Sequence, residues 1–149
     1  MTKLLLSFIL LISGCYFEVQ QPEEVAHMVD EFGELTKTNV QNIDIRFGKL
    51  GPLPGVTFIK SDATASCYNM VDRPRIRIDP GKWKVLTEPA KTALLWHELY
   101  HCKFGKKGHI SGRLSCEGYD HPHLMNSSVL DVELTESALD CYREWLRRL

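Results

Sequence analysis

The sequence lacks several features that would assign it to a familiar class. It has no internal repeat and no low-complexity tract, and its 18 basic residues nearly balance 19 acidic residues. No basic stripe indicates a nucleic-acid partner. There is no C-x-x-C pair, which argues against a zinc site built from thiolates. The 149 residues suit one compact domain with an ordinary apolar fraction.

The N-terminal segment is expected to lie outside the folded domain. Lys3 is followed by an apolar run over residues 4–12, which is too short to span a membrane. This run ends in Ile12-Ser13-Gly14-Cys15, which resembles the bacterial lipobox, where the signal peptide is cut before a cysteine that is then lipidated. The expected organisation is a lipoprotein signal peptide over residues 1–14, a membrane tether over 15–21 and a folded domain over 22–149.

The lipobox resemblance also implies a location. Tyr16 follows Cys15 at the position where an inner-membrane retention signal has Asp. In a Gram-negative source this implies a lipid anchor in the cell envelope, in the outer membrane facing the periplasm or the exterior. The alternative is an ordinary signal peptide that happens to contain Cys15.

Export changes the interpretation of the remaining cysteines. They are even in number, and an oxidising compartment favours disulfide bonds between them. Two disulfides are therefore expected, and the sequence does not distinguish the three pairings of four cysteines. The residues concerned are Cys67, Cys102, Cys116 and Cys141.

Periodicity predicts an α+β fold with a small sheet of about three strands. Apolar residues at helical spacing predict a first helix from Glu23 to about Thr38. Alternation predicts strands over 43–47, 56–60 and 75–79, the last with a basic face that suits the edge of a sheet. Residues 62–69 are polar and are expected to form a loop.

A central helix is predicted over 87–104. Thr87 can cap its first turn, and Gly105 can end it. Most of its circumference is apolar, which indicates a buried position. After it we expect a long irregular loop from Gly105 to Asp131 and a closing helix over 135–148. A loop of that length in a compact domain is expected to have a function.

The central helix carries His97-Glu98-Leu99-Tyr100-His101. Residues four apart lie on one face of a helix, so His97 and His101 can direct two imidazoles at one metal ion. Glu98 can reach a water at the metal and act as general base. This is the H-E-x-x-H pattern of zinc peptidases. The alternative is an amphipathic helix whose polar face carries two histidines by chance.

A catalytic zinc site needs a third protein ligand. His109 is the first candidate, because Gly105 allows the chain to turn back. Glu136 is a second candidate, because it begins an E-x-x-x-D pattern that resembles the gluzincin ligand helix. His121 and His123, in a polar loop, are the third.

The pattern H-E-x-x-H-x-x-x-G-x-x-x-H resembles the metzincins, with the third histidine two residues late. His123-Leu124-Met125-Asn126 resembles their Met-turn, although Met125 could equally be a core residue. With Cys102 after His101, the segment from Leu95 onward is most similar to a group of small bacterial and phage zinc metallopeptidases with an H-E-L-G-H-C core. Tyr100 replaces the glycine of that core.

The resemblance implies a minimal zincin-like domain that hydrolyses peptide bonds with Zn²⁺ on His97, His101 and His109. Its substrate would be a peptide or protein, and the sequence does not distinguish proteins from cell-wall peptides. The competing interpretation is a non-catalytic lipoprotein whose zinc is structural. A structural site would be closed by a fourth protein ligand, for example His121 or His123.

Overall fold

A computed structural model describes residues 18–50, 63–69, 73–105, 108–127 and 134–149. The expected signal peptide, Cys15 and the expected strand over 56–60 lie outside these ranges. Within them, no helix combines the length and the apolar character needed to cross a membrane.

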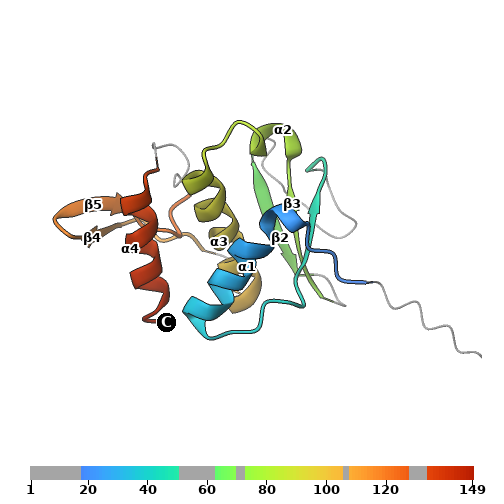
Figure 1. Cartoon of the computed structure of the whole chain (residues 1–149), viewed down its shortest axis with the longest axis horizontal. Coiled ribbons are helices and arrows are strands. Elements are labelled where there is room, and N and C mark those ends of the chain that lie inside the picture. The colour runs from blue at the N-terminus through green and yellow to red at the C-terminus, as the bar shows by residue number, and fades with distance from the viewer. Residues whose placement is uncertain (1–17, 51–62, 70–72, 106–107, 128–133) are drawn as a thin grey trace, which may run out of the picture.

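The architecture is the predicted small α+β fold. Figure 1 shows α3 in the middle of the molecule, with a sheet on one side and the last helix and a hairpin on the other. The elements in chain order are α1 (Glu23–Thr36), β1 (Asp44–Phe47), β2 (Ala65–Asn69), β3 (Pro74–Ile78), α2 (Pro80–Trp83), α3 (Glu88–Phe104), β4 (Arg113–Cys116), β5 (Tyr119–Pro122) and α4 (Glu136–Leu146).

The three-stranded sheet corrects the prediction that the strand over 75–79 lies at an edge. The strand order is β1-β3-β2, so β3 is central, parallel to β1 and antiparallel to β2. Its basic face is compatible with this position because a buried carboxylate compensates part of the charge. Asp44 Oδ2 accepts from Arg75 Nε at 2.7 Å and from Arg46 Nε at 2.9 Å.

The prediction of a loop over 62–69 was wrong for residues 65–69, which form β2. This strand is rich in small and polar residues and has few of the β-branched residues that favour strands. The strand conformation is instead stabilised by pairing with β3, in which Cys67 lies opposite Ile76. Among the described residues, β2 is therefore an edge strand, and it packs beside α3.

The core lies between α1, α3, α4 and the inner face of the sheet. α1 contributes the predicted apolar stripe, and it ends at Thr36 because Lys37 adopts a left-handed conformation with φ 53°. Trp96 of α3 is fully buried, and its indole N–H donates to the Met28 carbonyl at 2.9 Å. The buried stripe of α1 consists of Val25, Met28, Val29 and Phe32.

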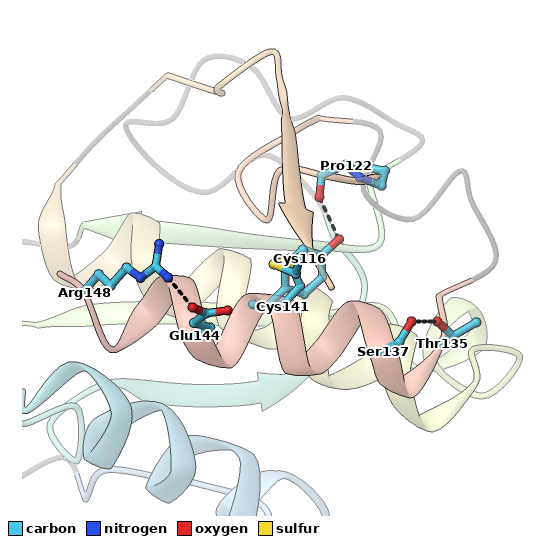
Figure 2. Close-up of a disulfide and its surroundings, with 8 residues drawn as sticks. Cys116, Pro122, Thr135, Ser137, Cys141, Glu144 and Arg148 are labelled. Carbon is cyan, nitrogen blue, oxygen red and sulfur yellow. Dashed lines mark hydrogen bonds and ion pairs between the residues drawn. A yellow bond between two sulfur atoms is a disulfide. The ribbon is translucent and has the colours of Figure 1, made fainter. Parts of the chain in front are cut away.

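The segment after α3 is more regular than the predicted loop. β4 and β5 form an antiparallel hairpin that projects beside α4 (Figure 1). Its turn has positive φ at Glu117 and Gly118, as tight hairpin turns require. Figure 2 shows the disulfide that joins Cys116 in β4 to Cys141 in α4.

The start of the described chain is attached to the sheet. The Gln20 N–H donates to Asp44 Oδ1 at 3.0 Å, and the Gln20 carbonyl accepts from the Ile45 N–H at 2.7 Å. The Gln21 side chain donates to carbonyls near the start of β1, including that of Ile43 at 3.2 Å. These two residues, which close the expected tether, thus contact the domain.

Candidate functional site

α3 is a rigid platform for the site. Its N-cap is Thr87, whose hydroxyl accepts from the Ala90 N–H at 3.4 Å, and it ends at Phe104, before the C-cap Gly105 with φ 62°. Both ends agree with the sequence prediction. Because α3 is buried on most sides, its side chains have little freedom to move. His97 and His101 are one turn apart, with ring centroids 4.7 Å from each other.

The chain returns after α3 and brings His109 to the same point. Its Nε2 lies 3.2 Å from His97 Nε2, and His101 Nε2 lies 3.0 Å from His97 Nε2. The three histidines form a group whose ligand atoms all lie within 4.8 Å of one another. His97 is buried, His101 is partly buried and His109 is exposed, so the group opens towards solvent at His109.

Two main-chain hydrogen bonds hold the segment that carries His109. The Ile110 N–H donates to the Met125 carbonyl at 2.9 Å, and the His123 N–H donates to the Gly112 carbonyl at 3.0 Å. These bonds close the base of the β4–β5 hairpin. The late position of His109 in the sequence is therefore accommodated by the geometry of this segment.

The same segment orients His97. Its Nδ1 lies 2.7 Å from the Leu124 carbonyl, which can only accept, so Nδ1 carries the proton and Nε2 has a free lone pair. Burial lowers the pKa of His97 to about 4, against the opposing effect of the Leu124 hydrogen bond. The neighbouring His101 and His109 lower it further. His97 is thus a neutral imidazole in the state that a metal requires.

The distances fit a tetrahedral ion. Two nitrogens that each lie about 2.05 Å from such an ion are about 3.3 Å apart. The observed separations of 3.0 and 3.2 Å are close to this value. The ring nitrogens of three histidines from two segments, all within 4.8 Å of one another, form a group that can hold a metal ion.

Glu98 lies beside this group and is only 7% exposed. Its Oε2 accepts a hydrogen bond from the Cys67 N–H of β2 at 2.7 Å. Burial raises the pKa of Glu98 to about 7, although the Cys67 N–H acts in the opposite direction. A carboxyl group with a pKa near neutrality can accept and release a proton under ordinary conditions.

The other predicted ligands lie outside this group, but His123 is near enough that its charge also lowers the pKa of His97. Among the described residues, the group that can hold a metal ion contains only the three histidines above. Glu136 begins α4, where its side chain is 72% exposed and 3.8 Å from Arg143. His121 lies in β5 opposite Leu114, and His123 Nδ1 accepts from the Met125 N–H at 3.0 Å.

Met125 is fully buried in a turn that follows β5. The Asn126 N–H donates to the His123 carbonyl at 2.8 Å and closes this turn. A turn was expected at this position from the Leu-Met-Asn pattern. Its clearest contribution to the site is made by Leu124, whose carbonyl binds His97.

Sequence reasoning missed two groups of the site, and both are main-chain atoms. The Leu124 carbonyl fixes His97, and the Cys67 N–H holds Glu98. Main-chain groups leave no residue-type signal in a sequence. An indirect signal was present for Cys67, because Cys102 directly follows His101 and its disulfide partner had to lie near the site.

Comparison with known proteins supports the same chemistry. Residues 62–124 match the model of a family described as "Putative phage metallopeptidase". The match includes β2, the whole of α3, His109 and Leu124, so it covers the three histidines, Glu98 and the two main-chain groups that hold His97 and Glu98. Searches of curated proteins and of solved structures returned no match. Over this segment the chain is similar to a metallopeptidase, and its three-histidine group is in accord with a metal-dependent enzyme.

Proposed function

We propose that the chain is a zinc-dependent peptidase that hydrolyses peptide bonds with Glu98 as general base. The observation that carries this proposal is the convergence of three histidine Nε2 atoms, 3.0 and 3.2 Å apart, beside a buried carboxyl group. The family match over residues 62–124 supports the metallopeptidase part of this proposal.

The donor set favours zinc over magnesium and calcium. Three neutral imidazoles suit a borderline ion, whereas magnesium and calcium prefer oxygen ligands. His97, His101 and His109 would hold the ion. When bound, zinc polarises a substrate carbonyl and lowers the pKa of water to about 7.

The site has the character of a catalytic centre rather than a structural one. A structural zinc usually has four protein ligands, whereas a catalytic zinc usually has three and keeps one position open. In the described part of the chain, three ligands come together, and His109 faces solvent. This favours the enzyme over a non-catalytic lipoprotein with a structural zinc.

The position of Glu98 supports a role in proton transfer. It is one residue from His97 and turns one oxygen to the Cys67 N–H. We assign the other oxygen to the water that attacks the scissile carbonyl. Glu98 takes a proton from this water and passes it to the leaving amine.

The cellular setting is proposed from the sequence alone. Cys15 would carry lipid chains and anchor the domain at the cell envelope, on the extracytoplasmic side. Two disulfides, Cys67–Cys102 and Cys116–Cys141, suit an oxidising compartment. A Cys15→Ser variant should leave the membrane fraction or remain unprocessed. Unchanged fractionation and unchanged mass would show that Cys15 is not lipidated.

The test of the enzymatic proposal is Glu98→Gln, which keeps the size of the side chain and removes the base. Wild type and variant are compared for zinc content and for cleavage of an unbiased peptide library. We expect equal zinc and a loss of rate of about 100-fold or more. If wild type binds zinc and cleaves no peptide, the structural-zinc alternative replaces the proposal.

A further inference from the structure

Cys67 makes two connections to the helix that carries the site. Its sulfur is bonded to Cys102 of α3, across a sequence separation of 35 residues. Its main-chain N–H donates to Glu98 Oε2 at 2.7 Å. Cys102 directly follows His101. One residue of β2 is therefore joined to α3 twice, by a hydrogen bond to Glu98 within the H-E-x-x-H motif and by a covalent bond to the residue after it.

The direction of the Cys67 N–H explains why it reaches Glu98. Main-chain N–H groups lie in the plane of a sheet, and those that do not pair with the neighbouring strand point to the other side. β2 pairs with β3 through its opposite edge, and the Cys67 N–H donates to Glu98, so this N–H is directed away from β3. Such an N–H is not held by a neighbouring strand. It keeps its hydrogen bond to Glu98 only while β2 stays in place beside α3.

The hydrogen bond matters to Glu98 because this carboxyl group is buried. A buried carboxyl without a partner is costly, and it would turn to find one. The bond from Cys67 fixes one oxygen and thereby the direction of the other. The position of β2 relative to α3 therefore determines where the proposed base points.

We propose that the Cys67–Cys102 disulfide is a positioning element that keeps the Cys67 N–H on Glu98, so that the oxidised chain is the active form. This inference rests on the proposed function. Reduction by a dithiol adds two electrons and two protons to the disulfide, giving two thiols, while the dithiol is oxidised to its own disulfide. The covalent bond between β2 and α3 is then lost, Glu98 loses its fixed orientation, and the three histidines keep their positions.

The chain contains a matched control. Cys116–Cys141 closes a loop of similar length, with a sequence separation of 25 residues, and joins the hairpin to α4. Cys67→Ala/Cys102→Ala keeps every main-chain N–H and removes only the tether at the site. Cys116→Ala/Cys141→Ala removes the other tether.

The kinetic test compares these two double variants with wild type, using a peptide that wild type cleaves. We expect Cys67→Ala/Cys102→Ala to lose about 10- to 100-fold in kcat with KM and zinc content unchanged, as for other groups that orient catalytic residues. The control should keep its kcat. Equal kcat in both variants, or loss of zinc from the first, would overturn the proposal.

A second measurement does not depend on peptidase activity. Amide hydrogen exchange of residue 67, followed by NMR, reports whether its N–H is bonded. We expect slow exchange in the oxidised wild type. Exchange should be at least about tenfold faster in Glu98→Ala and in Cys67→Ala/Cys102→Ala, since an exposed edge amide is unprotected.

The two measurements separate this inference from the proposed function. If wild type cleaves no peptide, the proposed function fails. The exchange rates then still show whether the disulfide holds the Cys67 N–H on Glu98. Equal exchange in wild type and in the Cys67→Ala/Cys102→Ala variant would overturn the positioning role.

Discussion

The two disulfides connect two regions with different tasks. Cys67–Cys102 ties β2 to α3, in the region that supplies His97, Glu98 and His101. Cys116–Cys141 ties the β4–β5 hairpin to α4, in the region whose base supplies His109 and the Leu124 carbonyl (Figure 2). The comparison shows that the site is assembled from two sides, namely α3 and the segment that returns to it after Gly105. A helix provides the fixed part, and a returning segment completes it.

The largest expected effect comes from removing His97, the histidine of α3 that contacts groups of both regions. His97 contacts His101, His109 and the Leu124 carbonyl. In His97→Ala the zinc affinity should fall by more than the 10- to 100-fold of an outer-shell change, that is by more than about 100-fold. Competition with a chromophoric chelator measures this affinity.

The control is His121→Ala, which removes an imidazole from the hairpin outside the metal-binding group. Its zinc affinity should equal that of wild type. If His121→Ala lost as much zinc as His97→Ala, the metal would lie on the hairpin side of the molecule, and the assembly from two sides would be wrong.

The next effect is the loss in the free energy of unfolding when either disulfide is removed. By chain entropy, loops of 35 and 25 residues are each worth about 3 to 4 kcal/mol, and they differ by only about 0.3 kcal/mol. Guanidinium unfolding of the two double Cys→Ala variants should give similar losses in the free energy of unfolding. A much larger loss in Cys67→Ala/Cys102→Ala would mean that its loss of activity reflects unfolding.

A smaller effect is expected at Asp44 of β1, which takes part in neither disulfide. Asp44 is fully buried and accepts from Gln20, Arg46 and Arg75. Burial acts to raise the pKa of Asp44, but these hydrogen bonds and the charge of Arg46 outweigh it and hold the pKa below 3.8. The folded state therefore favours the ionised form.

The sign of the pH dependence follows. The contribution of Asp44 to the free energy of unfolding is complete above about pH 5 and is lost as the pH falls towards the folded pKa. Asp44→Asn should cost about 2 kcal/mol at pH 7 and flatten this acid-side decline. Urea unfolding between pH 3 and pH 7, with the exposed Asp120→Asn as control, measures both. A wild-type decline that persists unchanged in Asp44→Asn would refute the assignment.

The smallest effect tests the second attachment of the hairpin to α4. The Tyr142 hydroxyl donates to the Pro122 carbonyl at 2.9 Å, and burial raises the pKa of Tyr142 to about 12, so it remains a donor. Tyr142→Phe should lower the free energy of unfolding by about 1 kcal/mol. The exposed Tyr119→Phe should change nothing measurable. Equal values for the two variants in thermal unfolding would contradict the role of this bond.

The platform of the site could be predicted from the sequence because its signals are local. Thr87 and Gly105 mark the ends of α3, and helical spacing places His97 and His101 on one face. The approach of His109 was harder to predict. It depends on hydrogen bonds between residues 110–112 and 123–125, which no local pattern records.

The strand beside the site could not be predicted, since Ala65–Asn69 has little strand propensity and is ordered by its neighbours. The central position of β3 was misjudged because Asp44, 31 residues before Arg75, compensates its charge from another strand. The pairing of the four cysteines could not be predicted either, because it depends on which distant segments come together in the fold. Each of these features depends on contacts between distant segments.

The central claim is that three histidines from two segments hold a zinc ion with one position left for substrate. X-ray absorption spectroscopy of the chain loaded with one equivalent of zinc tests this claim most directly. We predict three imidazole nitrogens and one non-protein oxygen at about 2.0 Å, with no sulfur. Four imidazoles, a sulfur ligand at about 2.3 Å, or a chain that takes up no zinc would contradict the claim.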